Sequence, residues 1–225
     1  MDWRFNTIAF DKLQEGKFFK ADFGVKKFEL DYDAFLNSEY AIIWHLKKKL
    51  EAFDSLPKSD KLLFIELNLA NINDLSGIAK YKNLKRLELH YCLKLLNDRG
   101  IARIKDSLMF LHINQSKKFE FTEELLQLKH LRVLCLNDCA PIDNLGFLDN
   151  FPHLIDFRFV NTIIRDGNLD PILDHPTIRS VGFLNKRHYN YKSEDIKEKL
   201  NEKFNNEDNR TYLTDGKNVT FRYDY

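Results

Sequence analysis

The sequence predicts an α/β solenoid, in which a curved parallel β-sheet is backed by return segments and capped at both ends. A nine-residue pattern with leucine at places one, four and six occurs twice, as LKRLELHYC at 84–92 and LRVLCLNDC at 131–139. The chain has 225 residues, of which 44% are hydrophobic, so it can form one sizeable core. A single copy cannot bury its own leucine row, and we therefore expect the copies to stack side by side.

The pattern occurs six times along the chain. Places one, four and six read Leu62/Ile65/Leu67, Leu84/Leu87/Leu89, Leu108/Leu111/Ile113, Leu131/Leu134/Leu136, Leu154/Phe157/Phe159 and Ile178/Val181/Phe183. Successive copies start 22 to 24 residues apart. Place nine reads Ala70, Cys92, Ser116, Cys139, Thr162 and Lys186, so it is small or hydrogen-bonding in every copy but the last. We expect the sixth turn to be distorted where it leads into the C-terminal cap.

Apolar residues at places four and six put two side chains of each strand on one face of the sheet, because side chains alternate along a strand. Places three, five and seven form the other face, which we call the odd face. Between the strands, residues 122–130 have helical spacing behind a threonine that can cap a helix, and 170–176 begin with Asp-Pro, as helices often do. The expected unit is therefore a strand followed by a short helical return.

This pattern resembles the leucine-rich repeat family over roughly residues 62–190, since repeats of about 20 to 29 residues with this leucine spacing are typical of that family. The resemblance implies short parallel strands, a return path with a helix or 3₁₀ turn, and a concave sheet that binds other proteins. It departs from the family in having no asparagine at place nine. In style the chain is similar to small stand-alone bacterial members, including cytoplasmic immunity proteins that neutralise a toxin.

The regions outside the repeats are expected to cover the ends of one continuous domain. Residues 1–57 form the N-terminal cap, with a strand at 26–35 and a helix at 38–53, followed by the repeats at 58–190. Residues 191–225 form the C-terminal cap, with an amphipathic helix at 193–204 and a β-hairpin at 211–223 that turns at Asp215-Gly216.

Composition and motifs argue against several classes of function. Lysine and arginine number 35 against 34 acidic residues, so no global charge attracts nucleic acid or an anionic membrane. There is no signal-like N-terminus and no apolar run of membrane-spanning length. Three cysteines at no metal-ligand spacing indicate reduced thiols in a cytoplasm. Phosphate-binding, dinucleotide-binding and hydrolase motifs are absent, so we expect neither a cofactor nor a metal site.

The odd face is the predicted binding surface. Two aromatic residues and a valine are expected to face solvent there beside charged groups, and exposed apolar groups rimmed by charge mark protein-binding patches. The alternative is that the two aromatics are covered by the N-terminal segment or by a return loop. The predicted contact residues are Phe64, Glu66, Arg86, Glu88, His90, Phe110, His112, Val133, Cys135, Asp156 and Arg158.

Three classes of function are consistent with these residues. The first is a non-enzymatic interaction module that binds a partner protein on the odd face. The second is an adaptor or substrate receptor in which residues 1–57 dock a larger assembly. The third is a thiol enzyme, because place five brings Cys135, His112 and Glu88 together as nucleophile, base and orienting acid. A wet sheet face without an oxyanion hole disfavours this third class. Cys135 is expected to point outward, and Cys92 and Cys139 inward.

Overall fold

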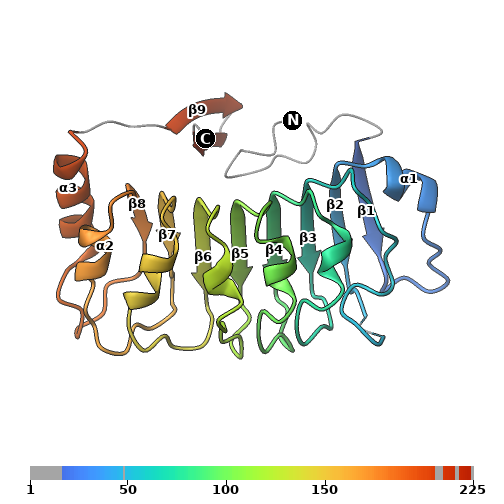
Figure 1. Ribbon diagram of the computed structural model, residues 1–225, viewed down its shortest axis with the longest axis horizontal. Coiled ribbons are helices and arrows are strands. Elements are labelled where there is room, and N and C mark those ends of the chain that lie inside the picture. Colours follow the sequence, from blue (N-terminus) through green and yellow to red (C-terminus); the bar gives the residue numbers. More distant parts are fainter. Residues whose placement is uncertain (1–16, 48, 206–209, 216–217, 224–225) are drawn as a thin grey trace.

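The computed structural model describes residues 17–47, 49–205, 210–215 and 218–223. Its main feature is a single sheet of eight parallel strands whose order in space follows the chain, as Figure 1 shows. The six predicted strands are confirmed, and two more precede them. The strands are β1 (Phe18–Asp22), β2 (Tyr40–Trp44), β3 (Phe64–Asn68), β4 (Arg86–His90), β5 (Phe110–Asn114), β6 (Val133–Asn137), β7 (Asp156–Arg158) and β8 (Ser180–Gly182).

Equal places of neighbouring repeats lie opposite each other in the sheet. Leu111 of β5, for example, pairs with Leu87 of β4 and Leu134 of β6. These three residues are fully buried, as are Leu89 and, almost completely, Leu136, so the predicted assignment of the core face is confirmed. The result is one long apolar core between the sheet and the return segments.

The return segments carry short helices that lie on one side of the sheet, in front of the strands in Figure 1. They are η2 (Ile78–Lys80), η3 (Ile101–Ile104), η4 (Leu125–Gln127), η5 (Gly146–Asn150) and the α-helix α2 (Asp170–Asp174). The helical spacing at 122–130 thus produces a single 3₁₀ turn. The fully buried Asp98 fixes this turn, since its carboxylate accepts the backbone N–H groups of Thr122 at 2.8 Å and Leu125 at 2.7 Å.

A left-handed backbone conformation recurs directly after the strands. Leu69 and Tyr91, at place eight of the first two repeats, have φ angles of 52° and 57°. Each donates its backbone N–H to the next repeat, Leu69 to His90 O and Tyr91 to Asn114 O, both at 2.9 Å. The other members of this series are His45, Gln115, Asp138 and Asn161. The same turn therefore follows the strands β2 to β7, and after β2 to β6 its backbone N–H joins the turn to the following repeat.

The N-terminal region differs from its prediction. The segment 38–53, expected to be a helix, contains strand β2, and the segment 26–35, expected to be a strand, leads into helix α1 (Tyr32–Asn37). The side chain of Asp31 caps this helix by accepting the N–H of Ala34 at 2.9 Å. β2 continues the sheet beyond β3, and β1 extends it once more, because pairing satisfies the backbone groups of the edge.

The C-terminal elements agree with their prediction. Helix α3 (Ser193–Lys203) buries Ile196 and Leu200 on one stripe. It is followed by an antiparallel hairpin of β9 (Arg210–Asp215) and β10 (Asn218–Tyr223), although the predicted turn residue Gly216 lies outside the described residues. In the part of the chain that the structure describes, no helix combines the length and the apolar character needed to cross a bilayer.

Candidate partner-binding site

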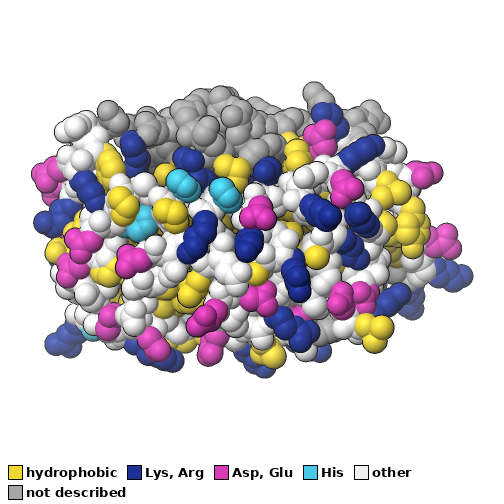
Figure 2. Space-filling model, viewed as in Figure 1, with side chains coloured by type: hydrophobic (Ala, Val, Ile, Leu, Met, Phe, Trp, Pro, Cys, Tyr) yellow, Lys and Arg dark blue, Asp and Glu magenta, His cyan; other side chains and the backbone are white. Residues whose placement is uncertain are grey.

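The surface over the return segments carries no field of one sign. Figure 2 shows that basic and acidic side chains are mixed across this face, with single hydrophobic groups between them. This agrees with the net charge of +1. The described residues of this face therefore offer no charged patch for a partner, and the clustered polar side chains lie on the odd face of the sheet.

The odd face is more closely packed than the sequence predicted. Its side chains were expected to face solvent, but most of those on β3 to β7 are buried. Among the predicted contact residues, the side chains that remain partly exposed are those of Glu66, His90, His112 and Arg158; those of Asn114, Asn137 and Val160 on the same face are also partly exposed. The buried ones are those of Phe64, Arg86, Glu88, Phe110, Val133, Cys135 and Asp156. Strands about 4.8 Å apart bring these side chains into contact with one another.

Arg86 lies between two aromatic rings on the odd face. Its guanidinium carbon is 5.4 Å from the ring centre of Phe64 on β3 and 3.8 Å from that of Phe110 on β5. The register places these three residues side by side at place three. A planar guanidinium stacks well on aromatic faces, so the two rings both bury the charge and orient it.

Glu88 is the centre of the polar network beside this stack. Its Oε1 accepts from Nε and a terminal nitrogen of Arg86 at 2.6 and 2.5 Å. Its Oε2 lies 2.9 Å from His90 Nε2 and 3.6 Å from His112 Nδ1. Burial alone would raise the pKa of the Glu88 carboxyl, but Arg86 and the two histidines together hold this pKa well below its ordinary value. Glu88 is therefore ionised at neutral pH.

The hydrogen bonds also indicate the tautomer of the His112 ring. Asn137 Oδ1 accepts the backbone N–H of Val160 at 2.8 Å, so the amide turns its Nδ2 toward His112 Nε2, 3.1 Å away. The Nε2 atom must then be an acceptor, and the ring proton lies on Nδ1, facing Glu88. For His90, burial lowers the pKa, but the hydrogen bond and charge of Glu88 outweigh burial and raise it overall.

Two further carboxylates lie on the odd face, Glu66 beside Glu88 and Asp156 on β7. Glu66 pairs across the strands with Glu88, and its pKa is raised by burial and by that neighbouring charge, although a hydrogen bond from Asn68 opposes the rise. Farther along, the fully buried Asp156 accepts from Arg158 Nε at 3.0 Å. The odd face thus has two groups of charged side chains, one centred on Glu88 and one on β7, with the uncharged side chains of β6 between them.

The predicted catalytic trio is not assembled for thiol chemistry. Cys135 does pair with His112 across the strands, but it is buried in a small apolar cluster with Phe110 and Val133. Burial raises the pKa of its thiol well above the ordinary value, whereas an activated thiol needs a lowered pKa. The two ring nitrogens of His112 face Glu88 and Asn137. The prediction that Cys135 is exposed was wrong.

We therefore expect the three thiols to react slowly in the native protein, at no more than about one tenth of their rate in urea, because reactivity requires exposure and a thiolate. Cys139 should react first, because it alone is partly exposed, even though burial raises its pKa to about 12. Burial also raises the pKa of Cys92 to about 11. Maleimide labelling followed by peptide mapping measures the order. Preferential native labelling of Cys135 would contradict the packing described above.

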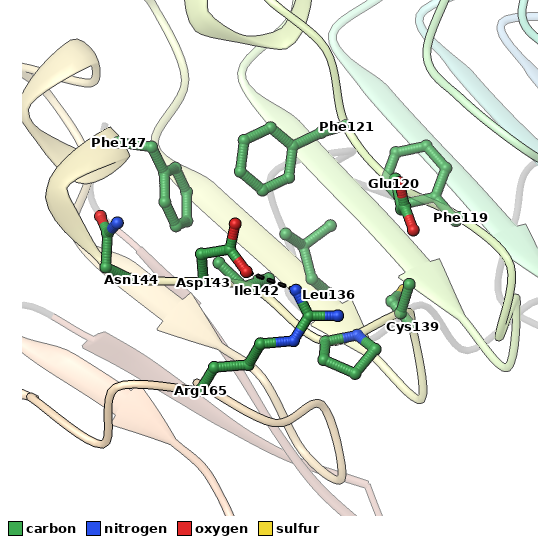
Figure 3. A pocket seen from close by; sticks show the side chains of 12 residues that line it. Phe119, Glu120, Phe121, Leu136, Cys139, Ile142, Asp143, Asn144, Phe147 and Arg165 are labelled. Carbon is green, nitrogen blue, oxygen red and sulfur yellow. Dashed lines mark hydrogen bonds and ion pairs between the residues drawn. The ribbon is translucent and has the colours of Figure 1, made fainter.

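A separate hollow of about 310 Å³ lies on the return-segment side, between the segments that follow β5 and β6. Figure 3 shows Phe121 and Phe147 facing each other along it, with a ring separation of 4.7 Å. Asp143 and Arg165 form an ion pair at the hollow, as the dashed line in Figure 3 marks. The sequence did not indicate this hollow, because most of its lining comes from return segments outside the leucine pattern. Asp143 and Arg165, two of its charged side chains, interact with each other, so it is a weaker candidate site than the odd face.

No protein-family model matches the chain, and neither the curated proteins nor the solved structures yielded a match.

Proposed function

We propose that this chain is a leucine-rich repeat protein that acts without catalysis, by binding a partner protein on the odd face of its sheet. Two features support the family assignment: the six-fold leucine pattern, and the pairing of equal places across neighbouring strands. The proposal includes a cap at each end, with the N-terminal region covering the first repeats and α3 covering β8. Three free cysteines favour a reducing compartment such as the cytoplasm.

The buried charged network on the odd face is the observation that carries this proposal. An ion pair such as Arg86–Glu88 contributes little net stability when buried, because desolvation offsets the attraction between the charges. A sheet selected only for stability would carry apolar or fully solvated side chains at these positions. The network holds the rings of His90 and His112 in fixed orientations, and ordered side chains lose less entropy when a partner binds.

The partner would meet a polar surface with a few apolar groups. The partly exposed side chains at its centre are those of His90, His112, Asn114, Asn137 and Arg158. They offer both hydrogen-bond donors and hydrogen-bond acceptors. One of them, Arg158, is a cation that pairs with the buried carboxylate of Asp156. Such a surface suits a folded protein with complementary polar groups better than a polyanion, because the acidic and basic groups of the face are balanced.

Within this class we favour an immunity protein that neutralises a bacterial toxin, on the style of the sequence. The alternative is an adaptor of a larger assembly, docked through residues 1–57. A toxin gene beside the gene of this protein would favour the immunity protein, whereas co-purification with several stable subunits would favour the adaptor. The low reactivity expected for Cys135 argues against the third class, the thiol enzyme.

The experiment is affinity capture with the parent protein and with variants that add a charge to the odd face. We expect Asn114→Arg and Val160→Arg to weaken binding of the captured partner by more than about tenfold, because both positions are half-buried and neither contributes to an ion pair described above. Isothermal titration with the purified partner gives the affinity. Circular dichroism first confirms that each variant is folded.

Gln127→Arg is the matched control, since it introduces the same side chain at an exposed position of η4, on the other side of the molecule. It should leave the affinity within about twofold of the parent. If the two odd-face variants bind the partner as tightly as Gln127→Arg does, the odd face is not the interface.

A further inference from the structure

Glu88, His90 and His112 bring three metal-binding atoms together. Oε2 of Glu88, a ring nitrogen of His90 and a ring nitrogen of His112 all lie within 4.8 Å of one another. Oε2 is 2.9 Å from His90 Nε2 and 3.6 Å from His112 Nδ1. In a tetrahedral zinc site with bonds of about 2.0 Å, neighbouring ligand atoms are about 3.3 Å apart. The distance from Oε2 to His90 is shorter than this ligand-to-ligand distance, and the distance from Oε2 to His112 is longer.

Strand pairing between β4 and β5 fixes the backbone positions of the three residues. Glu88 and His90 are two residues apart on β4, so both side chains project from the odd face, and His112 is the cross-strand neighbour of Glu88 on β5. The His90 and His112 rings meet edge to face with centres 5.0 Å apart. Sites built on strands hold their ligands more precisely than sites on loops, so only small side-chain movements would bring the three atoms to an ion.

We propose that Glu88 Oε2, His90 Nε2 and His112 Nδ1 form a binding site for a divalent transition-metal ion such as Zn²⁺. This inference is independent of the proposed partner binding. Two imidazoles and one carboxylate suit zinc, and three protein ligands leave the fourth position of a tetrahedral ion for water or for a donor atom of another molecule. The histidine side chains are 17% and 21% exposed, so solvent reaches the site.

Neighbouring side chains orient the three proposed ligands through hydrogen bonds. Arg86 donates to Oε1 of Glu88, and Oε2 of the same carboxylate faces the two histidines. An asparagine amide lies at the far nitrogen of each ring: Asn114 at 3.5 Å from His90 Nδ1 and Asn137 at 3.1 Å from His112 Nε2. Glu66, the cross-strand neighbour of Glu88, adds a second carboxyl group near the charge of the ion.

Metal binding requires each histidine to release the proton that faces Glu88. At His90 this proton is on Nε2, and the neutral ring can carry it on Nδ1 instead if the amide of Asn114 turns its oxygen to that atom. The rearrangement at His112 is larger. In the hydrogen-bonded network, His112 carries its proton on Nδ1, the atom that must bind the metal. The proton would move to Nε2, which then needs an acceptor, so Asn137 must turn its Oδ1 to the ring and give up the N–H of Val160. An aspartate at position 137 removes this conflict, because one carboxylate oxygen can accept from Val160 while the other accepts from His112.

The test is titration of the untagged full-length protein with Zn²⁺ by calorimetry and with Co²⁺ by visible absorption. We expect one ion per chain, at least tenfold weaker binding in His90→Gln and His112→Gln, and roughly tenfold tighter binding in Asn137→Asp. The control is His130→Gln with His153→Gln, which removes an exposed histidine pair whose ring centres are 6.5 Å apart and should leave binding unchanged.

Several results would overturn the proposal. They are a parent protein that binds neither ion, binding that survives His112→Gln, and an Asn137→Asp variant no tighter than the parent. A thiolate-to-cobalt band would likewise overturn it, because it would assign the ion to a cysteine. The Co²⁺ spectrum of the parent protein needs no substitution, so the proposal stays testable even if a histidine variant fails to fold.

Discussion

Replacing Glu88 by glutamine is expected to lower the free energy of unfolding by about 3 to 5 kcal/mol, the range measured when one partner of a buried ion pair is removed. The reason is Arg86, which is only 2% exposed and would keep its charge between two aromatic rings without the carboxylate that neutralises it. Urea denaturation at pH 7, followed by circular dichroism, measures the change. Glu120→Gln is the control, because Glu120 is exposed.

The double variant Arg86→Met, Glu88→Leu tests whether the stability loss of Glu88→Gln comes from the buried charge of Arg86 or from lost packing. Methionine and leucine can fill the space between Phe64 and Phe110 without burying any charge, so the double variant should recover most of the stability that either single variant loses. If the losses of Arg86→Met and Glu88→Leu simply add in the double variant, the charge that Arg86 keeps without Glu88 does not explain the effect of Glu88→Gln.

Replacing Leu111 by alanine is expected to cost about 2 to 5 kcal/mol, the usual range for a core leucine. Leu111 is fully buried at place four of the central strand β5, with Leu87 and Leu134 as its cross-strand neighbours. Removing its side chain leaves a cavity that the neighbouring strands, fixed by the sheet, can close only in part. The same urea experiment measures this loss.

Lys117→Ala is the control for Leu111→Ala, because Lys117 is an exposed residue soon after the same strand. Exposed substitutions change stability by no more than about half a kcal/mol. A loss below about 1 kcal/mol for Leu111→Ala would show that place four does not carry the core.

The central repeats could be predicted closely because their pattern is strong. Leucine or isoleucine at places one, four and six specifies both the strand and its inward face, and the cross-strand pairs between β3 and β6 follow the predicted register. A shift of one residue would have exchanged the two faces, which explains why the pattern defines the register so well.

The first two strands were missed because their sequences lack this pattern. β2 has Ala41 at place four, and β1 has Ala21 at place six, so the leucine pattern is interrupted in both strands. The segment 38–53 also contains good helix formers at helical spacing. Pairing with the edge of β3 outweighs that local preference, and such a long-range gain is not visible in a local pattern.

The sequence correctly predicted which side chains share the odd face, but not how deeply they are buried. Alternation along a strand tells which side chains share a face, and it correctly placed Arg86, Glu88 and His112 together. It does not tell how far a long side chain folds onto its neighbours. The stacking of Arg86 between two rings depends on rotamers and on strand spacing, so the sequence predicted an exposed surface where the structure has a packed one.

The strand order of the sheet has a consequence for how the molecule comes apart. Each of the strands β2 to β7 pairs only with the strand before it and the strand after it, so the structure behaves as a one-dimensional zipper. A defect near β1 or β8 can fray locally while the rest stays closed. A defect in β4 or β5 has intact neighbours on both sides and must open the zipper at its middle. The residues that orient Glu88 and His112 therefore lie where local opening is rarest.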